Sequence, residues 1–114
     1  MQYALLAYGR PAAMPGGAPR PIDDAIAAAL AQPSVTGWLR LHADESATTL
    51  RTDETRTLMT DGPFVDSKEY LAGVILIEAA DLDAALAVAQ EFQDARTGGA
   101  LEVRPIIEWL FRGA

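Results

Sequence analysis

Few side chains in this sequence can carry out acid–base chemistry. The chain has one histidine, His42, and no cysteine. A histidine titrates near neutral pH and can serve as a general acid or a general base. Asp61, in the run Asp61-Gly62-Pro63-Phe64, is the carboxylate that we pair with it. Proton transfer by His42 and Asp61 is therefore the one catalytic constellation that we assemble from the sequence.

The surroundings of both residues also allow a structural interpretation. Residues 43–46, which follow His42, have the composition of an exposed loop, where a histidine is usually solvated. Pro63 restricts Gly62, so the motif can be a rigid turn in which Asp61 accepts backbone N–H bonds. In the functional interpretation Asp61 faces a cleft as base or ligand acceptor, and Phe64 is an apolar wall. The sequence leaves both interpretations open.

Two cations complete the candidate ligand site. Lys68, the only lysine, can lie at the mouth of a cleft or form a surface ion pair with Glu69. Arg104 can hold a substrate carboxylate through two parallel hydrogen bonds or pair with a neighbouring glutamate. We therefore predict a ligand-binding set that consists of Asp61, Gly62, Pro63, Phe64, Lys68 and Arg104.

The donor set for metals is poor. With one histidine and no cysteine, only carboxylates remain, and none of their spacings resembles a calcium loop or a facial triad. The pairs Gly16-Gly17 and Gly98-Gly99 lack the strand and helix context of a phosphate-binding loop. We expect neither a metal nor a cofactor.

Size and charge narrow the classes of partner. The chain has 114 residues, enough for a single domain over residues 1–114. Nine basic and sixteen acidic residues give a net charge of −7, and no cluster of cations is visible. Nucleic acid and anionic membranes are poor partners for such a chain. No segment is long and apolar enough to span a bilayer, so we expect a cytoplasmic protein.

The first half of the sequence predicts a strand, a helix and several short strands. Residues 2–8 read as a buried strand, and residues 9–21, rich in proline and glycine, as a loop. The segment from Pro21 predicts a helix of about ten residues that stops before Pro33. Residues 35–42, 47–52 and 55–60 predict a β-meander, with a tight connection at Asp53-Glu54.

The second half predicts a central strand, an amphipathic helix and a last strand. Residues 70–77 are apolar at odd and even positions, which is typical of a strand covered on both faces. Asp81 is the expected N-cap of a helix that ends at Thr97-Gly98-Gly99. The apolar stripe of this helix consists of Leu82, Ala85, Leu86, Ala89 and Phe92. In the last strand, at residues 101–105, Leu101 and Val103 are the inward positions.

This order of elements predicts an α+β fold: a ferredoxin-like split βαβ arrangement with an antiparallel sheet and both helices on one face. The other face of the sheet must also be covered, since its central strand is apolar on both sides. Trp109, Leu110 and Phe111 near the C-terminus need burial as well. We therefore expect a homodimer in which two sheets associate.

The run Thr60 to Glu69, TDGPFVDSKE, resembles the signature of the YCII-related family, also called the DGPF domain family. Further similar segments are QYALLAYG, ATTLR, YLAGVILIEAADLDAALAVA and LEVRPIIE, which together cover most of the chain in the expected order. The resemblance implies a dimeric α+β barrel. It also implies a bacterial protein that is a small-molecule binder or a small enzyme, with its pocket near the DGPF loop and the helix-lined side of the sheet.

Three functional alternatives follow from the resemblance and the fold. Some relatives resemble small hydrolases or dehydrochlorinases with a His and Asp pair and a histidine on the first helix, whereas residues 22–32 here contain no histidine. Other relatives are encoded beside alternative sigma factors, which implies a non-catalytic regulatory module with a protein partner. Dimeric α+β barrels also include cofactor-free monooxygenases, an alternative that only the fold favours.

Overall fold

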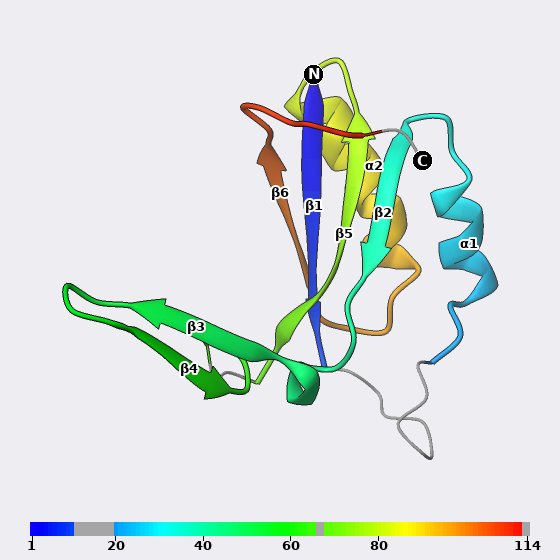
Figure 1. Cartoon of the computed structure of the whole chain (residues 1–114). Coiled ribbons are helices and arrows are strands. Elements are labelled where there is room, and N and C mark those ends of the chain that lie inside the picture. The colour runs from blue at the N-terminus through cyan, green and yellow to red at the C-terminus, as the bar shows by residue number, and fades with distance from the viewer. Residues whose placement is uncertain (11–19, 66–67, 113–114) are drawn as a thin grey trace.

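The structure is a computed structural model that describes residues 1–10, 20–65 and 68–112 (Figure 1). Strand β1 is followed by helix α1, strands β2 to β5, helix α2 and strand β6. Their bounds are β1 Gln2–Gly9, α1 Asp24–Leu30, β2 Val35–Arg40, β3 Thr48–Thr52, β4 Thr57–Asp61, β5 Tyr70–Glu78, α2 Leu82–Asp94 and β6 Ala100–Pro105.

Four of these strands form one antiparallel sheet in the order β2-β5-β1-β6. The two central strands, β1 and β5, are those with the most apolar sequences, and Leu5 lies opposite Ile75 at their centre. This arrangement confirms the predicted α+β fold of ferredoxin-like type. It also confirms residues 70–77 as part of a central strand.

The core lies between this sheet and α2, which crosses behind the strands in Figure 1. Tyr3 and Leu5 of β1 and Ile75 and Ile77 of β5 point toward the helix, and all four side chains are buried. Alternate positions on a strand face opposite sides of the sheet, which is why the buried residues recur at every second place. On the helix side the buried residues are Ala85, Ala89 and Phe92, with Ala29 from α1.

The ends of α2 confirm the predicted N-cap. The Asp81 side chain accepts a hydrogen bond from the backbone N–H of Ala84 at 2.8 Å, as in a standard helix cap. The predicted apolar stripe is wrong at two positions, because Leu82 and Leu86 are 50% and 45% exposed. The alanines bring the helix close to the sheet, and the two leucines lie outside the resulting contact.

Helix α1 is shorter than predicted. It has seven residues and no side-chain cap at Asp23, and the backbone N–H of Ala31 closes its last turn. The predicted loop at residues 9–21 falls largely on residues 11–19, which lie outside the described residues.

The predicted β-meander is wrong. Strand β2 pairs with β5, whereas β3 pairs with β4 in a separate two-stranded sheet, which we call the hairpin (Figure 1). A 3-10 turn at Asp44–Ser46 separates β2 from β3. The apolar β5 offers β2 a better packing partner than the threonine-rich strands that follow in sequence.

The hairpin connection spans four residues rather than the predicted two. The Asp53 carboxylate accepts hydrogen bonds from the backbone N–H groups of Thr55 at 2.8 Å and Arg56 at 3.0 Å. The N–H of Asp53 donates to the carbonyl of Arg56. The hydrogen bonds to the Asp53 carboxylate lower its pKa because they favour the charged form, and the bond from the Thr55 backbone N–H has the largest effect.

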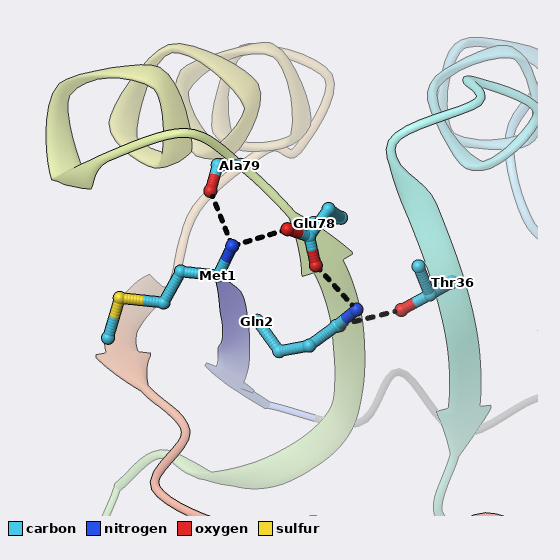
Figure 2. Close-up of polar contacts among 5 residues, drawn as sticks. All are labelled: Met1, Gln2, Thr36, Glu78 and Ala79. Carbon is cyan, nitrogen blue, oxygen red and sulfur yellow. Dashed lines mark hydrogen bonds and ion pairs between the residues drawn. The ribbon is translucent and has the colours of Figure 1, made fainter.

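Polar contacts join the strands at the N-terminal end of β1 (Figure 2). The N-terminal ammonium of Met1 pairs with the Glu78 carboxylate and donates to the carbonyl of Ala79. The amide of Gln2 donates to Glu78 at 2.7 Å and accepts from the Thr36 hydroxyl at 3.0 Å. These exposed contacts link β1, β5 and β2, and their main effect is on register rather than on stability.

The sheet face opposite the helices, which we call the open face, carries apolar side chains. Cross-strand pairs Ala4 with Leu76 and Leu6 with Val74 lie there, and Leu39 of β2 lies opposite Val74. Leu39 is 48% exposed, and the other four are half-buried. Beyond β6, residues 106–112 pass on the side of the sheet opposite α2 (Figure 1). Nothing among the described residues covers this face completely.

None of the described helices has the length and the apolar composition needed to cross a membrane.

The buried Phe92 provides a test of the core. Phe92→Ala removes a side chain that is 1% exposed, so it should lower the free energy of unfolding by about 3–5 kcal/mol. Leu86→Ala, on the exposed side of the same helix, should change it by less than about 1 kcal/mol. Urea denaturation followed by circular dichroism measures both. Equal losses for the two variants would contradict this core.

The Asp53 turn provides a test with pH. Because the pKa of Asp53 is lower in the folded protein, its contribution is complete above the pKa of an unfolded aspartate, about 4. The contribution is lost as the pH falls through the lower, folded value. We expect the Thr55 and Arg56 amide resonances to move toward unstructured positions in this acidic range. In Asp53→Asn the same resonances should not titrate; unchanged titration would contradict the assignment.

Candidate functional site

A cleft of ≈ 400 Å³ lies at the end of the sheet where β1 ends and β5 begins. Several separate segments contribute to it: the exit of β1, the start of α1, the residue before β5 and the turn after α2. Its described lining consists of Gly9, Arg10, Asp23, Ile26, Glu69, Ala95, Arg96, Thr97, Gly98 and Gly99. Two cations and two carboxylates therefore surround one hollow.

Arg96 forms the structural part of this cleft. Its guanidinium donates to the backbone carbonyls of Tyr8 at 2.6 Å and Ala100 at 2.9 Å, and to the Gln93 side chain at 3.2 Å. Burial lowers the pKa of Arg96, and the nearby Glu69 carboxylate acts in the opposite direction. The side chain thus joins the C-terminal end of α2 to β1 and β6, and most of its donors are occupied.

Gly99 allows this close approach. Its φ of +78° lies in the left-handed region, and a Cβ atom there would stand 2.2 Å from the carbonyl oxygen of Tyr8. Only glycine fits both the conformation and the space. The turn after α2 therefore has its sequence because it must lie directly against β1.

Arg10 is the second cation of the cleft and is more exposed than Arg96. Its Nε donates to the backbone carbonyl of Lys68 at 3.2 Å. The residue is exposed, and this contact holds the base of the guanidinium at the cleft. An exposed guanidinium in such a position is suited to a carboxylate or a phosphate.

A second hollow of ≈ 490 Å³ lies between the two helices. Its lining is mainly alanine, with Gln32, Glu91 and Asp94 as polar residues, and none of the lining residues is a cation. Its acidic lining would repel the anionic ligands that suit Arg10. The cleft at Arg10 is therefore the better candidate site.

The DGPF residues lie at the base of the hairpin and not in this cleft. Gly62 has φ of +101°, its N–H donates to the Ala47 carbonyl at 2.7 Å, and its carbonyl accepts from the Thr49 hydroxyl at 2.7 Å. Pro63 is half-buried, while Asp61 and Phe64 are exposed. The Arg51 guanidinium lies 5.3 Å from the centre of the Phe64 ring. Within one chain, the motif forms a turn at the base of the hairpin, at the end opposite the connection between β3 and β4.

The structure does not join the predicted catalytic pair. His42 follows β2 and is exposed, and Asp61 ends β4 opposite Thr48. No hydrogen bond between the two occurs among the described residues. Proton transfer by His42 and Asp61 stays a prediction.

The two predicted cations are also separate. The backbone of Lys68 contacts Arg10 at the cleft, and its side chain is exposed. Arg104 lies on β6 opposite Ala4, on the open face, and is exposed. Of the predicted ligand-binding residues, only Lys68 is therefore close to the cleft.

The cleft residues Arg10, Asp23, Glu69 and Arg96 were not predicted as a site. Glu69, next to Lys68 in the DGPF-containing run, gave the nearest signal. Arg96 gave a second signal, because a cation directly after the C-terminal end of a helix, before a Thr-Gly-Gly stop, is favoured there by the helix dipole. Neither signal shows that the four residues meet.

Within residues 1–10, 20–65 and 68–112, no group of three or more histidine or acidic side chains is placed to hold a metal ion.

Comparison with known proteins gives two matches. Residues 1–110 match the family model of the YCII-related domain. Over 68 residues, the chain is 43% identical to an uncharacterized protein of Rhizobium meliloti (strain 1021). That match covers 59% of this chain and 55% of the relative, so it spans little more than half of each. Since the family model covers nearly the whole length, the chain belongs to the YCII-related family.

Proposed function

We propose that this member of the YCII-related family binds a small anionic molecule in the cleft at Arg10. The observation that carries the proposal is the exposed guanidinium of Arg10, which the backbone carbonyl of Lys68 holds at the cleft through its Nε. Arg96, by contrast, donates hydrogen bonds to backbone carbonyls of β1 and β6 and so stabilises the fold. A carboxylate or phosphate of the ligand would pair with Arg10, and polar groups of the ligand could meet Asp23 or Glu69.

The geometry favours binding over catalysis. The acid–base pair predicted from the sequence is His42 and Asp61. Both residues are exposed, and no hydrogen bond between them occurs among the described residues. General acid–base catalysis requires such groups within hydrogen-bond reach of the reacting atoms. The regulatory and monooxygenase alternatives stay predictions, because no described contact favours either.

We also propose that the chain functions as a homodimer. The open face carries Leu6, Leu39, Val74 and Leu76, and the residues after β6 expose large apolar side chains on the same side of the sheet. A second copy would bury these surfaces, as two sheets do when they pack face to face.

A thermal-shift screen tests the ligand site. A library of small carboxylates and phosphates should contain compounds that raise the melting temperature of the wild type. A ligand at a hundred times its dissociation constant stabilises the folded state by about 2.7 kcal/mol, which corresponds to several degrees. The shift should disappear in Arg10→Gln and persist in Asp61→Asn and in Arg104→Gln.

Arg56→Gln, at the hairpin connection, is the control for loss of one positive charge. A shift that depends on Asp61 or Arg104 instead of Arg10 would place the site at the predicted residues. A library in which no anion shifts the wild type would count against the proposal.

Light scattering at micromolar concentration tests the homodimer. We expect a mass twice the 12.2 kDa of the chain, independent of concentration in this range. A stable mass of one chain would overturn the homodimer. Because the Arg10 cleft lies within one protomer, that result would leave the ligand site standing.

A further inference from the structure

The hairpin of β3 and β4 has no partner within the described part of its own chain. The two strands pair only with each other, and neither joins the four-stranded sheet. Figure 1 shows the hairpin projecting away from the body of the protein. A two-stranded hairpin with both faces in water is at best marginally stable, and it normally needs a third strand or a packing surface.

The hairpin also exposes large apolar side chains. Leu50 and Met59 lie directly opposite each other and are 63% and 73% exposed. At its base, Phe64 and Val65 of the DGPF segment are 69% and 62% exposed. Scattered apolar residues on a surface are ordinary, but an exposed cross-strand apolar pair on a projecting hairpin marks an interaction surface.

A second apolar surface lies at the other end of the sheet. The N–H of Ile106 donates to the carbonyl of Gln2, and from there the chain leaves β6. We call residues 106–112 the tail. Its exposed side chains are Ile107 at 92%, Trp109 at 55%, Leu110 at 75% and Phe111 at 56%.

The strand register fixes where these two surfaces lie. Tyr70, at the hairpin end of β5, pairs with Gly9, whereas Tyr3 at the start of β1 pairs with Pro105 beside the tail. The hairpin and the tail are therefore at opposite ends of the same sheet. A two-fold axis that lies between two open faces and runs perpendicular to the strands exchanges these ends. It brings the hairpin of each protomer to the tail of the other.

The area is sufficient for a stable dimer. The apolar side chains of the hairpin pair and of the tail, together with the open face between them, can supply the roughly 800 Å² that one partner usually contributes to a specific interface.

We propose that the hairpin is an intersubunit arm that packs on the tail of the partner protomer. The inference rests on the proposed homodimer and names the segments that hold it together. Leu50 and Met59 contact the partner's apolar tail. The DGPF turn then has a structural role, because it sets the angle at which the hairpin leaves its own sheet.

Disulfide trapping tests this arrangement, because the chain has no cysteine of its own. In the double variant Met59→Cys/Leu110→Cys, the two thiols of one chain lie at opposite ends of the sheet. Oxidation should therefore link two chains and give about tenfold more covalent dimer than the control Met59→Cys/Leu86→Cys, whose second thiol is on α2. Non-reducing electrophoresis measures the dimer fraction.

A second pair, Leu50→Cys/Ile107→Cys, serves if the first variant fails to fold, and the reduced forms should show the circular dichroism of the wild type. If light scattering reports a dimer and neither pair forms disulfides above the control, the arm is wrong and the homodimer stands. A monomeric wild type overturns both.

Discussion

The whole structure depends on how closely α2 lies on one face of the sheet. Ala85 and Ala89 present so little side chain that the helix can approach β1 and β5, and Phe92 fills the remaining space beyond them. Apolar burial of this kind is the dominant favourable term in folding, and large side chains in the contact would push the helix away. Both helices pack on this same face of the sheet. The opposite face is left with apolar residues and with incomplete cover from the described part of its own chain.

The same close packing builds the cleft. Because α2 ends against β1, the Arg96 guanidinium reaches the Tyr8 and Ala100 carbonyls, and these hydrogen bonds offset the cost of its partial burial. Gly99 turns the chain at a point where any side chain would meet Tyr8. The hollow beside this junction is bordered by Arg10, whose exposed guanidinium donates through Nε to the Lys68 carbonyl. A half-buried arginine that stabilises the fold and an exposed arginine thus lie in one cleft, and the proposed ligand site uses the second.

The DGPF motif lies at the base of the hairpin, away from the Arg10 cleft. In a single chain the hydrogen bonds of Gly62 hold the base of the hairpin together, and Asp61 is exposed to solvent. Its exposed Phe64 lies against Arg51, at the base of the hairpin. Among the described residues, the two strands of the hairpin pair only with each other. These features fit the proposed arm. Acid–base chemistry at Asp61 stays a prediction.

The sequence by itself determined the elements and most of the topology. The doubly apolar run at residues 70–77 could only be a central strand, and Asp81 with the alanine-rich stripe defined the second helix, since these signals are local and periodic. The pairing of β2 with β5 rather than β3, and the exposure of Leu82 and Leu86, came from packing between distant segments. The cleft is the clearest case. Arg10, Asp23, Glu69 and Arg96 are separated by long stretches of sequence, and no spacing rule relates them, so only the folded chain brings their charges together.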